Sequence, residues 1–197
     1  MSAKIFLSTV SDEFRRYRDV LRSDLTRHDV EVKVQEDFKD FSGETLDKLG
    51  VYIAHCDAVL RLVGDMTGAY PGERGLSALL TKYPDLPTKL PPVGAALNDG
   101  VGVSYTRWEA WLALYHRKLL LIAEAEEAAE REPQYAPTDA SRTAQDVHLA
   151  RLSACLKSPR RPITERNGPL SNPTPAVQLW RREPPNLPQS RLCARRS

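Results

Sequence analysis

The chain has 197 residues, of which 41% are hydrophobic and 27% charged, a composition typical of one globular domain that can bury a core. Its formal charge of +2 hides an imbalance, because residues 1–150 carry 18 basic and 24 acidic side chains and residues 151–197 carry 10 and 2. The three cysteines are widely spaced without a CxxC pair, which argues against a disulfide framework and a zinc site. No stretch approaches the roughly 20 apolar residues that cross a bilayer, so we expect no membrane partner and a cytoplasmic location.

Strand and helix patterns alternate along the first third of the chain. Residues 4–10 form a short apolar run, residues 30–38 alternate valines with charged side chains like an outer strand, and residues 58–64 form a third, largely apolar run. Apolar residues at helical spacing follow each of the first two runs. Strands that alternate with helices predict an α/β fold with a parallel, doubly wound sheet.

The middle of the chain, residues 66–103, is rich in Gly and Pro and shows one short helical pattern around residues 76–80. We interpret it as an insertion over one edge of the sheet, since long loops in compact domains are uncommon and often functional. A helix over 104–118, a fourth strand over 118–125 and a closing helix over 138–156 complete a first domain, residues 1–157.

The last segment, residues 158–197, holds 8 of the 15 prolines and shows neither strand nor helix periodicity. This composition predicts a disordered, basic Pro/Arg-rich tail. A basic tail can bind nucleic acid without sequence preference, but its aromatic content is limited to Trp180, so nucleic acid is not the partner we expect.

The predicted sheet topology indicates where a ligand would bind. Parallel sheets bind ligands at the carboxyl ends of their strands, where Ser8, Thr9 and Ser11 follow the first strand and residues 36–41 follow the second. The helix over 104–118 begins on the same side and brings Glu109 near this edge. Neither GxGxxG nor GxxxxGK[ST] occurs and the four histidines are scattered, so we expect no bound nucleotide cofactor and no metal.

Two interpretations of Glu109 stay open at this level. Thr106 and Glu109 fit a capping box, in which the glutamate returns to the backbone N–H of the cap residue. Ser104 is an equally good cap, and a helix that begins there places Glu109 too deep for this role. Helical phasing places Glu109 at the edge of a buried aromatic stripe, where a carboxylate can face a cleft.

The order of five segments, KIFLSTVSDEFRRYRDVLR, VQEDF, LGVYIAHCDAVLRLVGD, YTRWEAWLA and KLLLIA, resembles a TIR domain over residues 3–156. The resemblance is strongest to the TIR-like N-terminal module of bacterial multidomain signalling proteins. It implies a flavodoxin-like TIR fold whose mainly parallel sheet has four or five strands and helices on both faces. The loop EDFKDFSGE after the second strand keeps Asp37 and Gly43 but lacks the Arg and Pro usual in the family.

The resemblance also implies an activity. The adjacent pair Trp108-Glu109 matches the segment whose glutamate is catalytic in TIR domains that cleave NAD, so Glu109 is the implied catalytic residue and NAD a substrate rather than a cofactor. A carboxylate can stabilise the positive charge that develops on the ribose as nicotinamide leaves. The family further implies self-association with like TIR domains in bacterial signalling or defence. The candidate substrate-binding residues are Ser8, Thr9, Ser11, Asp37, Phe38, Phe41 and Trp108.

Two other functions remain open. The missing Arg and Pro of the loop after the second strand favour a non-catalytic TIR-type interaction module. A nucleoside-processing transferase shares both the sheet topology and a catalytic glutamate.

Overall fold

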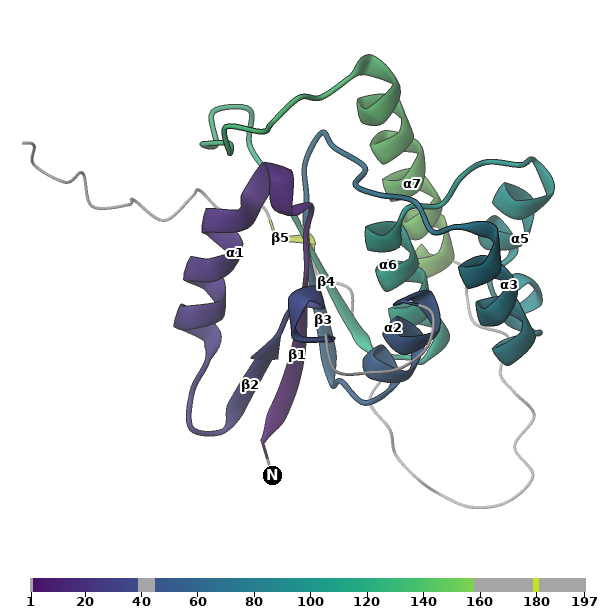
Figure 1. Ribbon diagram of the computed structural model, residues 1–197, viewed down its shortest axis with the longest axis horizontal. Helices are drawn as coiled ribbons and strands as arrows, with labels where there is room; N and C mark the ends of the chain where they lie inside the picture. Colours follow the sequence, from purple (N-terminus) through teal and green to yellow (C-terminus); the bar gives the residue numbers. More distant parts are fainter. Residues whose placement is uncertain (1, 39–44, 158–178, 181–197) are drawn as a thin grey trace, which may run out of the picture.

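The computed structural model describes residues 2–38, 45–157 and 179–180 of the chain. Its centre is a parallel sheet with the strand order β2-β1-β3-β4-β5 (Figure 1). The strands are β1 (Ala3–Ser8), β2 (Val30–Lys33), β3 (Ala58–Val63), β4 (Leu119–Glu124) and the two-residue β5 (Leu179–Trp180). The chain therefore adds strands outward on one side of β1 and then on the other.

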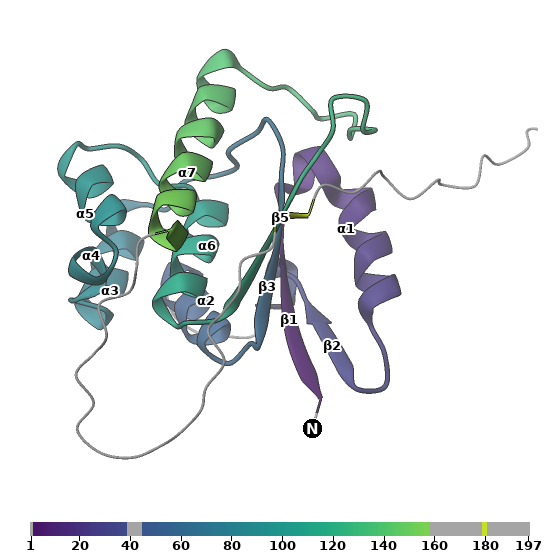
Figure 2. The same cartoon turned by 180° about the vertical axis from the view of Figure 1, so that it is seen from behind.

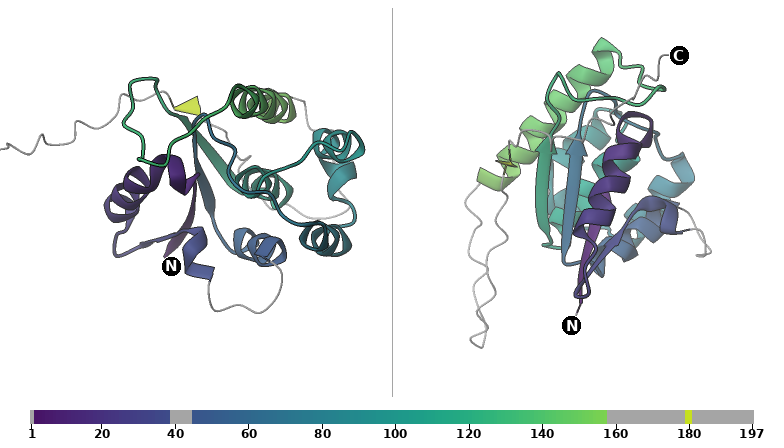
Figure 3. Two further views of the ribbon diagram at one scale, coloured as in Figure 1. Left: turned by 45° about the horizontal axis from the view of Figure 1, so that its top comes forward. Right: turned by 90° about the vertical axis from the view of Figure 1, so that its left-hand side faces the viewer.

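Helices cover both faces of this sheet. Helix α1 (Ser11–Leu25) lies on one face, while α2 (Thr45–Ala54), α6 (Tyr105–Tyr115) and α7 (Asp139–Lys157) lie on the other (Figure 3). This strand order and helix placement confirm the predicted α/β, flavodoxin-like fold. The order reverses between β1 and β3, and the carboxyl ends of these two strands are where such sheets bind ligands.

The sheet separates two hydrophobic cores because successive side chains of a strand point to opposite faces. Phe6 belongs to the large core under α2 and α6, which also contains Leu49, Val59, Trp108 and Leu120. The next residue of β1, Leu7, belongs to the small core under α1 with Val32 and Val34. Each such fully buried side chain contributes about 1.5–3 kcal/mol to folding.

The Gly/Pro-rich segment 66–103 is more helical than its sequence predicts. Instead of one short helix it contains α3 (Glu73–Lys82), α4 (Leu86–Lys89) and α5 (Pro91–Asn98). Prolines occupy the first helical positions of α4 and α5, where the missing N–H costs no hydrogen bond. The three helices lie outside α2 and α6, with α3 in contact with α2, and not over an edge of the sheet (Figure 2).

The second predicted strand is shorter than expected. Strand β2 ends at Lys33, and residues 35–38 form the 3-10 helix η1 (Gln35–Phe38). The side chain of Asp37 makes the turn, since its Oδ2 accepts the N–H of Val34 at 3.0 Å while its own N–H donates to the Val34 carbonyl at 3.0 Å.

Two further expectations concern the basic tail and a membrane-spanning helix. Apart from β5, the predicted disordered tail 158–197 lies outside the described residues. In the part of the chain that the structure covers, every helix is too short or too polar to cross a membrane.

Candidate functional site

The carboxyl ends of β1 and β3 place two polar residues side by side. Ser8, the last residue of β1, pairs in register with Arg61 of β3. Register partners in a parallel pair point to the same face, here the face covered by α6. Both residues are 1% exposed, so a hydroxyl and a guanidinium lie buried at the point where the strand order reverses.

Glu109 of α6 reaches this point from above the sheet. Its carboxylate is 1% exposed, and the Ser8 hydroxyl donates a hydrogen bond to its Oε2. These residues are 101 positions apart in sequence, and their contact ties α6 to the end of β1. The structure thus brings together Glu109 and Ser8, two of the residues that the sequence nominates.

The capping interpretation of Glu109 is wrong. Helix α6 begins after Ser104, so Glu109 is its fifth residue and lies too far along the helix to form a capping box. Thr106 is inside the helix, and its hydroxyl donates to the Thr67 carbonyl at 3.2 Å. No side-chain hydrogen bond caps this helix start.

Arg61 is the charged residue that sequence reasoning missed. Burial lowers the pKa of its guanidinium to about 10, although the negative charge of Glu109 acts in the opposite direction, so Arg61 remains a cation at neutral pH. Its Nε and Nη1 have no hydrogen-bond partner in the described part of the chain. An arginine in the middle of the apolar run AVLRLV was the available sequence signal, since a strand buried on both faces excludes charge unless a partner is present.

The other residues nominated at the end of β1 lie close by. The Thr9 hydroxyl is buried and lacks a hydrogen-bond partner within residues 2–38, 45–157 and 179–180. Ser11 is the first residue of α1, and its Oγ accepts a hydrogen bond from Arg18 Nη1 at 2.9 Å. Of these two, only Thr9 presents a polar group without a described partner.

Of the remaining nominated residues, the structure describes the surroundings of Trp108 and Asp37. Trp108 is 1% exposed and packs in the large core, and the small pocket that it lines contains neither Ser8 nor Glu109. Asp37 is held in its own turn and by Arg22, whose Nη2 lies 3.1 Å from Oδ1. Phe38 is the last residue of η1, and Phe41 lies outside the described residues.

A second buried carboxylate, Glu13, shapes the same end of the sheet. It accepts the backbone N–H groups of Asp65 and Met66, both at 2.9 Å, and lies 3.2 Å from Arg131 Nε. These bonds hold the segment after β3 against the first turn of α1. The sequence gives no signal for this role beyond an acidic residue near a helix start.

The comparisons with known proteins do not assign the chain to a family. No family model matches the chain, and no curated protein matches it. Among the described residues, no three His, Cys, Asp or Glu side chains are placed to hold a metal ion. What the geometry offers is a carboxylate, a hydroxyl and a guanidinium at the ligand-binding edge of a flavodoxin-like sheet.

Proposed function

We propose that the chain is an NAD hydrolase that cleaves the bond between nicotinamide and ribose, with Glu109 as its catalytic carboxylate. The observation that carries the proposal is the position of Glu109, hydrogen-bonded by Ser8 where the strand order reverses between β1 and β3. Ligands of this fold class bind at that edge. The TIR resemblance adds the reaction and its bacterial signalling or defence setting.

In this reaction the Glu109 carboxylate stabilises a positive charge and does not donate a proton. As the bond breaks, its electron pair goes to the nicotinamide ring and cancels the pyridinium charge, so the leaving group needs no proton. The ribose becomes positively charged, and the Glu109 carboxylate stabilises that charge. Water then adds to the ribose carbon and loses a proton to solvent. Ser8 orients the carboxylate, and Arg61 and Thr9 hold donors that suit ribose or phosphate oxygens.

Burial of the site supports activation by self-association. Glu109 and Ser8 are each 1% exposed, so NAD reaches the carboxylate only after α6 or the neighbouring segments move. We propose that assembly with further copies of the chain causes this movement. The same burial favours the second candidate, a non-catalytic interaction module in which Ser8 and Glu109 only fasten α6 to the sheet.

The test is nicotinamide release from NAD by the full chain, measured dilute and at high concentration with a crowding agent. We expect release that rises with assembly and is abolished in Glu109→Gln. Glu73→Gln is the matched control, because Glu73 is an exposed glutamate in the first turn of α3, and it should leave the rate unchanged. Full activity in Glu109→Gln would remove Glu109 from the proposal.

Sedimentation of the same samples separates the alternatives. Concentration-dependent assembly without nicotinamide release, in wild type and in Glu109→Gln alike, would replace the enzyme by the interaction module. Release of a base from free nucleosides, dependent on Glu109 and absent with NAD, would assign the chain to the nucleoside-processing transferases instead.

A further inference from the structure

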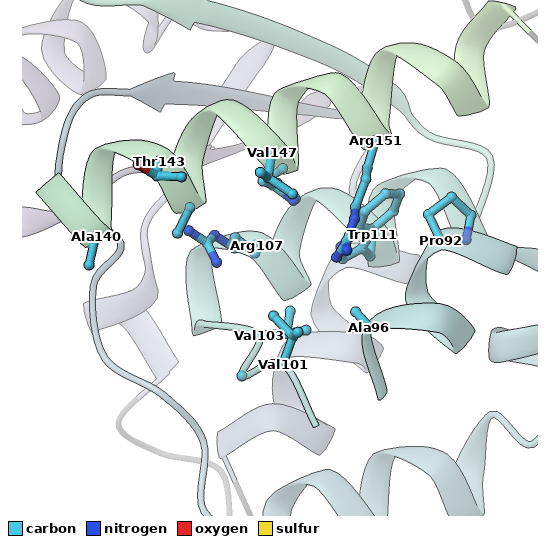
Figure 4. Close-up of a pocket in the computed structure, with 13 residues that line it drawn as sticks. Pro92, Ala96, Val101, Val103, Arg107, Trp111, Ala140, Thr143, Val147 and Arg151 are labelled. Carbon is cyan, nitrogen blue, oxygen red and sulfur yellow. The ribbon is translucent and has the colours of Figure 1, made fainter. Parts of the chain in front are cut away.

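A cavity of about 470 Å³ lies between α6, α7 and the stretch from α5 to the start of α6 (Figure 4). Its size is within the range of sites that bind small organic molecules. Glu109 does not line it. The lining residues are Pro92, Ala96, Val101, Gly102, Val103, Arg107, Trp111, Ala140, Thr143, Ala144, Val147, His148 and Arg151.

The charged side chains of this lining are all basic. Arg107 and Arg151 approach the cavity from α6 and α7, and none of the described lining residues is acidic (Figure 4). Arg107 is 5% exposed, and its Nε donates to Gln145 Oε1 at 3.3 Å. Its Nη2 is buried without a hydrogen-bond partner in the part of the chain that the structure describes. Burial of a guanidinium with an unpaired donor lowers the stability of the fold unless an anion accepts a hydrogen bond from that donor.

The position of Arg107 is fixed before any ligand binds. The amide of Gln145 that accepts from Arg107 donates in turn to the Met66 carbonyl at 2.8 Å. His148, next along α7, packs its ring edge-on against Trp111, with the centroids 5.3 Å apart. Burial and the nearby arginines hold the pKa of His148 well below its usual range, so its ring is neutral at pH 7 and adds a polar nitrogen without a charge.

The rest of the lining is apolar. Trp111 forms one wall and Val147 faces the cavity from α7, while Val101 and Val103 lie opposite α7 (Figure 4). Such walls match a flat apolar molecule, whereas a small inorganic anion would leave most of the cavity empty. The two arginines match a planar carboxylate, which guanidinium groups bind through paired hydrogen bonds.

We infer that this cavity binds an organic monocarboxylate with a flat apolar body, its carboxylate on Arg107 and Arg151 and its body against Trp111 and Val147. The inference is independent of the proposed NAD chemistry, since it needs neither Ser8 nor Glu109. Because Arg107 belongs to the same helix as Glu109, an occupied cavity also braces α6.

Naphthalene-2-carboxylate is the probe, and titration calorimetry on the full chain is the measurement. We expect the carboxylate to bind at least about tenfold more tightly than naphthalene-2-carboxamide, because a hydrogen bond to a charged group is worth about 1.5–3 kcal/mol. Inorganic phosphate should not displace it at equal concentration. Equal affinity for the carboxamide, displacement by phosphate, or no binding at millimolar probe would each overturn the inference.

Variants of the lining residues test whether the probe binds in this cavity. Arg151→Gln and Arg107→Gln should each weaken binding of the carboxylate at least about tenfold. Ala144→Trp should abolish binding by filling the cavity, which keeps the test decisive even where Arg107→Gln fails to fold. Arg15→Gln, an exposed arginine of α1 on the other face of the sheet, should bind like wild type. Wild-type affinity in both Arg151→Gln and Ala144→Trp would place the probe elsewhere and refute the site.

Discussion

The Ser8 hydroxyl donates a hydrogen bond to the Glu109 carboxylate and so joins the last residue of β1 to the middle of α6. Both partners are buried, and Arg61 lies beside Ser8 in the register of β1 and β3. A buried carboxylate is tolerated only when donors or opposite charge surround it. The attachment of α6 to the sheet therefore depends in part on these three side chains.

Ser8→Ala and Ser104→Ala test whether the serine at the end of β1 contributes more to the free energy of unfolding than the serine at the start of α6. Ser8→Ala removes a donor from a buried carboxylate and should lower the free energy of unfolding by about 1–3 kcal/mol. Ser104→Ala should cost no more than about 1 kcal/mol, because the Ser104 side chain makes no capping bond and loses only the 3.3 Å contact of its hydroxyl with that of Thr106. Urea titration of both variants gives the comparison, and the reverse order would show that the start of α6 contributes more to stability than the Ser8–Glu109 bond.

A double-mutant cycle measures the coupling of Glu109 and Arg61. Glu109→Gln leaves the Arg61 cation buried without its opposing charge and should cost about 3–5 kcal/mol. Arg61→Met leaves the carboxylate with the Ser8 bond and should also destabilise. The double variant should be more stable than the sum of the two losses predicts, by at least about 1 kcal/mol. Additive losses would show that the two charges do not stabilise each other.

The general architecture follows from local patterns, whereas the site does not. The alternation of apolar runs with helical spacing predicts the parallel sheet, because strand and helix periods of 2 and 3.6 can be read residue by residue. A proline in the sequence is ambiguous, because it is common both in loops and at the start of helices. Pro91 and Pro92 suggest a loop, yet they begin α5. Which role they take depends on the packing of α5 in the large core, which the local sequence does not encode.

The contact between Ser8 and Glu109 could be expected only through topology. The sequence makes both residues candidates because parallel strands present their carboxyl ends at one edge. The sequence does not make Arg61 and Arg107 candidates. The periodicity of a strand or helix predicts which face is buried, but not which buried polar groups will find partners. Trp108 belongs to the large core, and its predicted contact with substrate stays a prediction.

Gly64→Ala should be poorly tolerated because of Glu13. A Cβ at Gly64 would clash with the Glu13 carboxylate. The carboxylate cannot move aside without losing the N–H groups of Asp65 and Met66 that it accepts. We expect a loss of more than about 2 kcal/mol in the free energy of unfolding, since a buried carboxylate would lose its donors. Gly72→Ala is the matched control, because its Cβ meets nothing within 4 Å, and it should change stability by less than about 1 kcal/mol. Similar melting temperatures for the two variants would contradict this assignment.

His148 should make the stability of the protein depend on pH. Burial first, and then the charges of Arg61, Arg107 and Arg151, hold its pKa well below 6.5 in the folded protein, whereas the unfolded chain has the ordinary value of about 6.5. Below pH 6.5 the unfolded state therefore binds a proton that the folded state refuses. The free energy of unfolding should fall as the pH falls from 6.5 to 5, with a slope of up to about 1.4 kcal/mol per pH unit, and this contribution should be constant above pH 7.

His148→Gln isolates this contribution, because a glutamine does not titrate. The difference in free energy of unfolding between wild type and His148→Gln should move in favour of the variant as the pH falls from 6.5 to 5. His116, whose pKa burial also lowers, is present in both proteins and cancels in the difference. Urea titrations at half-unit pH steps measure the effect. A difference that stays constant over this range would mean that His148 titrates alike in the folded and unfolded states, and that its side chain is open to water at the α6–α7 contact.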